Sequence, residues 1–263
     1  MKINIVGGSG VMGRVHSRVF EYSGHKTIIT GRSSEVSPES AAKECDITII
    51  SVPLSATEET IKKVAPHAKA IVDFSSVKIK PIEWMKKYSS QNSEVAGLHP
   101  LYGEADSIKC RSIVFCKTEK TGKNCLELVE ILKKAGGAKI IEISPEEHDL
   151  YVNGIAQNVR TILLESFGKM VLNKKIDIKK FYDISPPPTK IILDLLARQA
   201  NEANDEMYSS MKKLNPLQEE LNKEIKKILE ETILKQNPAE IRDFFGEAIK
   251  SAQQRADKRI DKE

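Results

Sequence analysis

One histidine of this 263-residue chain stands where it could do acid–base chemistry. His99 lies in residues 97–103, which read Gly-Leu-His-Pro-Leu-Tyr-Gly and continue an apolar run typical of a buried strand. Because the unperturbed pKa of a histidine is about 6.5, its side chain can accept a proton from a substrate hydroxyl near neutral pH. Taken alone, His99 is equally well explained as a structural residue of a turn.

A glycine pattern near the start of the chain predicts a dinucleotide-binding site. Residues 8–13 match G-x-G-x-x-G and lie between an apolar run at 3–6 and a helix expected over 14–22. In this pattern Gly8 permits a tight turn, Gly10 lets the backbone approach a pyrophosphate, and Gly13 lets the helix pack on the strand. The N–H groups at the start of the helix then attract phosphate. A glycine turn in an unrelated fold is the alternative interpretation.

The residues after the second expected strand indicate which dinucleotide is bound. A carboxylate there would hydrogen-bond the ribose 2′-hydroxyl of NAD, but residues 30–34 read Thr-Gly-Arg-Ser-Ser. The guanidinium of Arg32 and the hydroxyl of Ser33 suit the 2′-phosphate of NADP. NADP is therefore the favoured cofactor and NAD a possible one, whereas the alternative is a solvated loop with an incidental arginine.

The elements that must hold these residues alternate along the first half of the chain. Apolar runs expected to be strands fall at 3–6, 27–30, 47–52, 70–74, 94–98, 112–116 and 139–143. With helices between them, they predict an α/β domain at 1–144, a Rossmann-type doubly wound parallel sheet. Ser144 and Pro145 then begin a helical pattern. An all-α domain is expected at 145–263, with helices over 145–173 and 189–213 and two more separated by Asn237-Pro238.

Composition narrows the class of protein. The 41 basic and 37 acidic residues alternate in sign, which argues against nucleic-acid binding. No apolar run approaches the roughly 18–20 residues that a membrane span needs. The start of the chain does not resemble a signal peptide, and the four cysteines show no C-x-x-C spacing, which favours a cytoplasmic protein whose thiols pack in the core.

Three segments directly follow expected strands and should line one crevice, because ligands of open parallel sheets bind at the carboxyl ends of the strands. They are 51–54 (Ser-Val-Pro-Leu), 73–78 (Asp-Phe-Ser-Ser-Val-Lys) and 97–100 (Gly-Leu-His-Pro). The residues expected to bind the cofactor are Gly8, Ser9, Gly10, Val11, Met12, Gly13, Arg32, Ser33, Ser51, Val52 and Pro53. No metal site is expected: His148 lacks a second ligand at suitable spacing, which favours a structural or domain-joining role. His16, His25 and His67 are interpreted as packing or surface residues.

With these motifs linked, the chain resembles the prephenate dehydrogenase family of tyrosine biosynthesis. The resemblance includes the glycine-rich start, residues 51–53, the Asp-x-x-Ser-Val-Lys of 73–78, the Gly-x-His-Pro-x-x-Gly of 97–103, Glu-His-Asp at 147–149, and the helix carrying Lys190 and Arg198. It implies an oxidative decarboxylation. His99 takes the proton of the substrate 4-hydroxyl, hydride passes from C4 to the nicotinamide, carbon dioxide leaves C1, and the product is 4-hydroxyphenylpyruvate.

The resemblance also assigns further residues. Ser76 matches the hydroxyl that orients the catalytic histidine, and Arg198 matches the arginine that holds the ring carboxylate; by themselves they would be a turn hydroxyl and a solvated helix residue. Asp73 and Lys78 are expected to shape their loop rather than react. Where many members carry a second histidine, this chain has Arg160, preceded by Gln157 and Asn158. Arg160 suits the pyruvyl carboxylate of prephenate better than the ammonium of arogenate, although the side chain of arogenate keeps a carboxylate too.

Three other interpretations stay open. The chain could be an arogenate dehydrogenase, a β-hydroxyacid dehydrogenase or deazaflavin-dependent NADP reductase of the same architecture, or a non-catalytic NADP-binding sensor. Partners are a small substrate and a second copy of the chain, since family members pair through their helical domains. The apolar face of the tail suits either packing on the preceding helices or the same contact between two copies; it consists of Ile225, Ile228, Leu229, Ile233 and Leu234.

Overall fold

The computed structural model describes residues 1–103, 106–202 and 205–235. By its internal contacts the chain forms two compact units, residues 1–218 and 219–263. The first unit contains the whole sheet and the helices that follow it as far as residue 214. The domain boundary expected at residue 144, where the sheet ends and the helices begin, stays a prediction.

Within the described residues the sheet has seven strands in the order β2-β1-β3-β4-β5-β6-β7. All seven predicted runs form strands, each shifted by two residues or fewer. Their bounds are β1 (Lys2–Val6), β2 (Lys26–Thr30), β3 (Ile47–Ile50), β4 (Ala70–Asp73), β5 (Glu94–Pro100), β6 (Ser112–Cys116) and β7 (Lys139–Glu142).

One strand pair departs from the expected parallel sheet. β5 and β6 are antiparallel, with His99 opposite Val114, while all the other neighbours are parallel. A parallel connection needs a crossover of a dozen or more residues, usually a helix. Only residues 101–111 join β5 to β6, so the chain turns back beside the strand it has left. This arrangement carries β5 two residues further than predicted and places His99 inside the strand.

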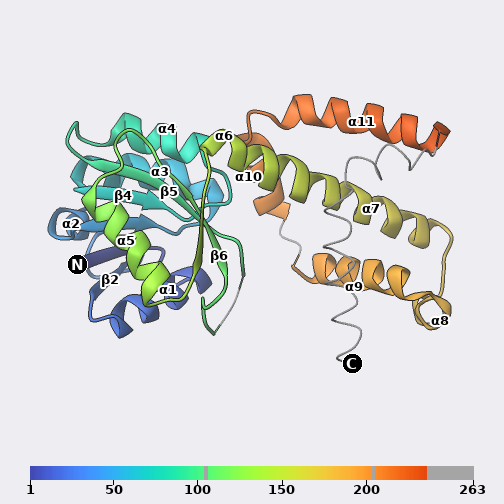
Figure 1. The fold of residues 1–263 in the computed structure, drawn as a ribbon, viewed down its shortest axis with the longest axis horizontal. Helices are drawn as coiled ribbons and strands as arrows, with labels where there is room; N and C mark the ends of the chain where they lie inside the picture. Colours follow the sequence, from blue (N-terminus) through green and yellow to red (C-terminus); the bar gives the residue numbers. More distant parts are fainter. Residues whose placement is uncertain (104–105, 203–204, 236–263) are drawn as a thin grey trace. The chain divides into compact units, whose positions relative to one another are not determined.

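Helices cover both faces of the sheet (Figure 1). α1 and α5 contact each other on one face, and α3 and α4 contact each other on the other. Buried side chains such as Ile5, Phe20 and Leu128 fill the first layer, and Ile50, Ile61 and Met85 fill the second. The helices are α1 (Val11–Tyr22), α2 (Pro38–Glu44), α3 (Leu54–Val64), the 3₁₀-helix η1 (Ala65–His67), α4 (Ile79–Tyr88) and α5 (Lys123–Lys134).

The predicted helix over 145–173 is interrupted by a change of helix type. After α6 (Pro145–His148) the chain forms the nine-residue π-helix η2 (Asp149–Gln157) and then α7 (Asn158–Asn173). Ser144 begins this segment as predicted, because its side chain accepts from Glu147 N while Glu147 caps the Ser144 N–H in return. π-Helical segments are rare and are frequent at functional sites.

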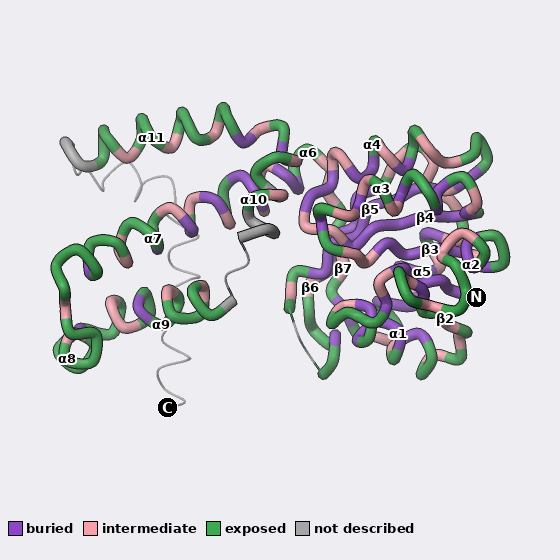
Figure 2. The backbone as a smooth tube through the Cα atoms, turned by 180° about the vertical axis from the view of Figure 1, so that it is seen from behind, coloured by how far each residue is buried: buried purple, intermediate pink, exposed green. Residues whose placement is uncertain are grey.

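The remaining helices differ from the expected pattern. α8 (Ile178–Ile184) was not predicted, and the helix expected over 189–213 is two helices, α9 (Pro187–Glu202) and α10 (Asp205–Leu214). α9 packs on α7, and α10 contacts α3. In the tube of Figure 2 most of the buried backbone lies in the sheet, whereas long stretches of α7 to α9 are exposed.

α11 (Gln218–Lys235) is the last described helix. Of its predicted apolar face, Ile225 and Leu229 are half-buried and Ile228 is exposed. The side chains of Ile233 and Leu234, and the helix expected after Asn237-Pro238, lie outside the described residues. No helix in the described part of the chain is long and apolar enough to cross a membrane.

Candidate active site

The glycine loop between β1 and α1 has the close packing that a dinucleotide cradle needs. A Cβ atom on Gly13 would overlap the Cα of Gly8, so only glycine lets α1 begin this close to the loop. The tight turn lies one residue earlier than predicted: Gly7, not Gly8, has the positive φ of 84°. No side chain caps the N-terminus of α1, and its first turn carries no acidic residue. Its N–H groups therefore suit a phosphate.

The segment after β3 lies against this loop. A Cβ on Gly7 would overlap the Ser51 carbonyl and lie 3.0 Å from Val52 Cγ1. Ser51 N also donates to Val6 O at 2.8 Å, which continues the pairing of β1 with β3. Two of the predicted cofactor-binding segments, residues 8–13 and 51–53, are thus brought together at the carboxyl edge of the sheet.

Arg32 and Ser33 follow the neighbouring strand at the same edge. The Gly7 N–H donates to Thr30 O at 2.8 Å, which fixes the end of β2 beside the glycine loop. Two residues later Arg32 is exposed, as is Ser33. This is where a Rossmann-type site holds the ribose of the adenosine half. The residues at this edge fit a dinucleotide, and the guanidinium is accessible to a 2′-phosphate.

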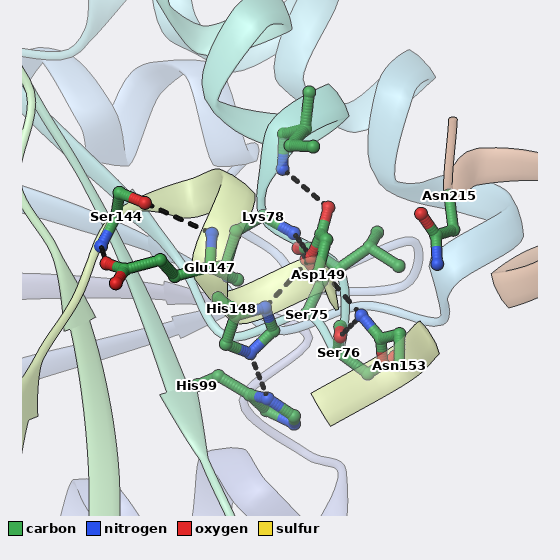
Figure 3. A network of polar contacts seen from close by, with 12 residues as sticks. Ser75, Ser76, Lys78, His99, Ser144, Glu147, His148, Asp149, Asn153 and Asn215 are labelled. Atoms are coloured by element: carbon green, nitrogen blue, oxygen red, sulfur yellow. Dashed lines mark hydrogen bonds and ion pairs between the residues drawn. The ribbon is translucent and has the colours of Figure 1, made fainter. Parts of the chain in front are cut away.

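His99 is buried near the end of β5 and contacts a second histidine from the helical region. Its Nδ1 lies 2.8 Å from Nε2 of His148, the last residue of α6. The two rings meet edge to face, with 5.0 Å between their centroids. Figure 3 shows His148 between His99 and the carboxylate of Asp149. The structure therefore joins the predicted base to a residue that the sequence patterns did not assign to the site.

Asp149 connects the first turn of the helical region to the loop after β4. Its Oδ1 accepts from the backbone N–H of Lys78 at 2.8 Å, and its Oδ2 accepts from that of Ile79 at 3.0 Å. These N–H groups begin α4, whose own N-cap position lacks a capping side chain. Asp149 thus caps α4 from a distant part of the chain. A structural or domain-joining role was predicted for His148. In the structure His148 and Asp149 contact each other, and Asp149 connects the helical region to the loop after β4.

Asp73 and Lys78 form a fully buried ion pair beneath the same loop. Lys78 Nζ also donates to the carbonyl of Leu98 at 2.8 Å, next to His99 in β5. Asp73 accepts from the N–H and hydroxyl of Ser75. Burial raises the pKa of Asp73, and the adjacent Lys78 ammonium opposes that shift. These contacts shape the loop, as expected for the pair.

Ser76 lies in this loop between Asp73 and Lys78. Its backbone carbonyl accepts from Asn153 Nδ2 at 2.7 Å, a contact between the loop and η2. Ser76 is half-buried, and among the described residues the side chain that contacts His99 Nδ1 is that of His148. That Ser76 orients the base or binds substrate stays a prediction.

The three predicted substrate-binding residues lie further along the helical region. Gln157 ends η2 and is half-buried. Arg160 lines a hollow of about 580 Å³ together with apolar side chains such as Leu163, Phe167 and Ile192. Arg198 lies on α9 and is exposed. Among the described residues no group of three or more His, Cys, Asp and Glu side chains could hold a metal ion.

His16, interpreted from sequence as an ordinary packing or surface residue, links the cofactor helix to the segment after β5. Its Nδ1 lies 2.7 Å from the Met12 carbonyl, which can only accept, so Nδ1 carries the proton. Its Nε2 then accepts from the Tyr102 hydroxyl at 3.0 Å. Burial lowers the pKa of His16 to about 4. The link fixes residues 97–103 relative to the glycine loop.

His148, Asp149 and Asn153 belong to this network, although the sequence assigned none of them a role at the active site. One signal was available: a histidine next to a carboxylate in the first turn after the sheet ends. The contacts span 49 residues from His148 to His99 and 77 from Asn153 to Ser76, and motif spacing does not reveal pairings at such distances.

Comparison with known proteins agrees with the motifs. The family described as "Prephenate dehydrogenase, nucleotide-binding domain" matches residues 25–142. The "Probable arogenate/prephenate dehydrogenase" of Methanocaldococcus jannaschii is 29% identical over 242 residues, which are 84% of this chain and 54% of that protein. The chain spans about half the length of the curated relatives it matches first.

Two solved structures share the fold. Prephenate dehydrogenase from A. aeolicus, in complex with hydroxyphenyl propionate and NAD+, superposes with a TM-score of 0.71 at 19% identity, covering 100% of this chain and 98% of that one. Synechocystis arogenate dehydrogenase gives a TM-score of 0.64 at 18% identity, covering 100% of both chains. The family match over residues 25–142 and the curated relatives make the chain similar in sequence to prephenate and arogenate dehydrogenases.

Proposed function

We propose that the protein is a prephenate dehydrogenase that oxidatively decarboxylates prephenate to 4-hydroxyphenylpyruvate and reduces NADP, or NAD, in tyrosine biosynthesis. The observation that carries the proposal is the buried His99, held at 2.8 Å by His148 at the carboxyl edge of a sheet that also bears the glycine loop. The similarity to prephenate and arogenate dehydrogenases supports the reaction type.

His99 would act as the proton acceptor. Burial in the first place, and then the neighbouring His148 and Lys78, hold the pKa of His99 well below 6.5. The imidazole is therefore neutral at physiological pH and has a lone pair for the 4-hydroxyl proton. A bound nicotinamide would supply the hydride acceptor. The remaining work of the protein is alignment of the substrate, because loss of carbon dioxide and aromatisation drive the reaction.

A direct assay tests the proposal. The purified protein is mixed with prephenate or arogenate, each with NAD or NADP, and reduced nicotinamide is followed by absorbance. We expect turnover, with prephenate and NADP giving the highest kcat/KM. A much higher kcat/KM for arogenate would identify an arogenate dehydrogenase, the alternative that the name of the M. jannaschii relative also allows. Absence of turnover in all four mixtures would favour a non-catalytic NADP-binding sensor.

The preference for prephenate rests on Arg160. Its guanidinium fork suits a carboxylate and repels the ammonium that arogenate carries in its side chain. The hollow that Arg160 lines is otherwise apolar, being formed by Ile155, Leu163 and Phe167 among others. An arginine beside apolar side chains would favour an organic acid there. Arg198 is proposed to hold the ring carboxylate, and Gln157 to contact the substrate side chain.

The cofactor preference predicts the effect of removing Arg32. In Arg32→Ser, kcat/KM for NADP should fall roughly 10- to 150-fold, because a hydrogen bond to a charged group contributes about 1.5–3 kcal/mol. The kcat/KM for NAD should change less than about threefold. Steady-state kinetics with each cofactor measure the difference between the two effects. Arg18→Ser, which removes an exposed arginine of α1, is the matched control. Equal losses with NAD and NADP would refute a 2′-phosphate contact.

The depressed pKa of His99 predicts a particular pH dependence. Only the neutral imidazole accepts a proton, so kcat/KM should stay level as the pH falls through 6.5 and decline only at distinctly lower pH. The charged or titratable groups around it are His148, Lys78, Asp149 and Asp73. A profile of kcat/KM from pH 4.5 to 8, with circular dichroism at each pH, measures this. If kcat/KM has already fallen to half of its maximum at pH 6.5 or above, the expected pH dependence is wrong.

A homodimer through the helical region is part of the proposal. Large apolar side chains are exposed on α7 and α9, namely Leu163, Met170, Leu172, Ile191, Ile192 and Leu195. Contiguous exposed apolar surface often marks an interaction site. Sedimentation velocity should give about twice the mass of 29.4 kDa. The cytoplasmic location expected from sequence stays a prediction.

A further inference from the structure

We propose that His148 and Asp149 are positioning residues that fix the tautomer of His99, so that His99 Nδ1 carries the proton and Nε2 keeps its free lone pair. The inference rests on the proposed function, in which His99 accepts a proton from the substrate. It adds how the protein prepares the accepting atom, through two residues to which the sequence assigned no role in the reaction.

Asp149 is surrounded by hydrogen-bond donors. Its carboxyl oxygens lie 2.8 Å from Lys78 N, 3.0 Å from Ile79 N and 3.2 Å from Asn153 Nδ2. His148 Nδ1 lies 2.8 Å from Oδ1 as a fourth partner. The two backbone groups can only donate, and an ionised carboxylate can only accept. The partners therefore match the carboxylate form of Asp149.

The state of His148 follows from this carboxylate. Since Asp149 accepts, the proton of His148 must be on Nδ1. Burial lowers the pKa of His148, which leaves the ring neutral with a bare Nε2. His148 Nε2 is thus an acceptor, and it points at His99, as Figure 3 shows. The Asp149 carboxylate, which accepts from the backbone N–H groups at the start of α4, thus sets the tautomer of His148.

The state of His99 follows in turn. With His148 Nε2 as acceptor, the contact of 2.8 Å is a hydrogen bond only if His99 Nδ1 donates. The opposite tautomer would bring two lone pairs face to face in a buried site, where an unsatisfied polar group is unfavourable. Neutral His99 consequently has its second nitrogen, Nε2, unprotonated. This is the atom that can take the substrate proton.

The pair is held rigidly enough to act through His99. Ser144 and Glu147 form a capping box at the start of α6, and His148 is fully buried one residue later. Asn153 Nδ2 bonds both Asp149 and the Ser76 carbonyl, which ties η2 to the loop after β4. When His99 takes up a proton, the resulting imidazolium keeps the same bond to His148. The Asp149 carboxylate lies one ring further and favours the positive charge.

Nitrogen-15 NMR of the full chain labelled in its histidines tests the tautomer directly. The chain has five histidines, so His99→Asn and His148→Gln variants suffice to assign these two. At neutral pH without substrate, we expect His99 to show a protonated Nδ1 and a bare Nε2, and His148 the same. A protonated Nε2 on His99 overturns the proposal.

Kinetics test whether the tautomer matters for turnover. In His148→Gln the side-chain oxygen can still accept from His99 Nδ1, whereas His148→Leu cannot accept. We expect kcat of the leucine variant to fall roughly 10- to 100-fold, a part of the 10²–10⁴ that a general base contributes. The glutamine variant should recover most of that loss, and KM should change less than about threefold in both. His67→Gln is the control for the substitution of histidine by glutamine, because His67 lies on η1, away from His99 and His148.

The outcomes separate this inference from the proposed function. A wild-type protein that turns over prephenate, with His99 protonated at Nε2 or with equal kcat for the glutamine and leucine variants, refutes the positioning role and leaves the enzyme assignment. A wild-type protein without turnover but with the expected tautomer refutes the assignment and leaves the tautomer. If His148→Leu does not fold, the NMR result on the wild-type chain still decides.

Discussion

Replacing His99 by asparagine is expected to lower kcat/KM for the preferred substrate by about 10²–10⁴, the usual contribution of a general base. Asparagine can donate its amide N–H to His148 Nε2, so the bond of 2.8 Å in the native network keeps a partner. It has no nitrogen that can accept a proton near neutral pH. The loss should therefore fall mainly on kcat, and cofactor affinity should change little.

Steady-state kinetics and a fluorescence titration of the cofactor measure the two effects of this variant separately. His67→Asn is the matched control, since it makes the same exchange at a half-buried position on η1. A loss of kcat/KM smaller than tenfold would show that His99 is not the proton acceptor. A large loss accompanied by an equal loss of cofactor affinity would indicate a structural role instead.

Lys78→Met is expected to lower the free energy of unfolding by about 3–5 kcal/mol, the usual cost of leaving one member of a buried ion pair without its partner. Both side chains of the Asp73–Lys78 pair are fully buried, so water cannot replace the ammonium. The Leu98 carbonyl also loses its donor at 2.8 Å. Urea unfolding can be followed through the one tryptophan, Trp84, in the helix that begins after Lys78.

The double variant Asp73→Asn/Lys78→Met separates the charge from packing. Asparagine removes the buried carboxylate and still accepts from Ser75 N, a bond of 3.1 Å in the native loop. The double variant should recover more than half of the lost stability. If it is no more stable than Lys78→Met, or if Lys78→Met loses less than about 1 kcal/mol, burial of an unpaired charge is not the cause.

Much of the fold could be predicted because continuous apolar runs are a local property of a chain. Strands buried on both faces read as such runs, and all seven are found. The direction of β6 is not local in this sense, because it depends on whether the eleven residues after β5 form a helix. The π-helix after His148 was missed because the apolar pattern of only nine residues does not distinguish i→i+5 from i→i+4 hydrogen bonding.

The site was predictable where a residue type is dictated by backbone geometry or by position after a strand. The glycine loop and the segment 51–53 meet at the edge of the sheet, with Gly7 against Ser51 and Val52, and His99 is near the end of β5. His148 was interpreted from its own neighbours in sequence, which suggested only a structural role. Its contact with His99 arises from the packing of α6 on the sheet, and a single sequence without an alignment carries no signal of that packing.

In the proposed function this chain couples hydride transfer to loss of carbon dioxide, with His99 as the proton acceptor. The most direct measurement is the stoichiometry of one reaction mixture with prephenate and NADP, in which reduced nicotinamide, carbon dioxide and 4-hydroxyphenylpyruvate are each quantified. We expect equal amounts of all three with the wild-type protein and none above background with His99→Asn on the same time scale. Reduced nicotinamide without an equal amount of carbon dioxide, or equal rates in both proteins, would contradict the account.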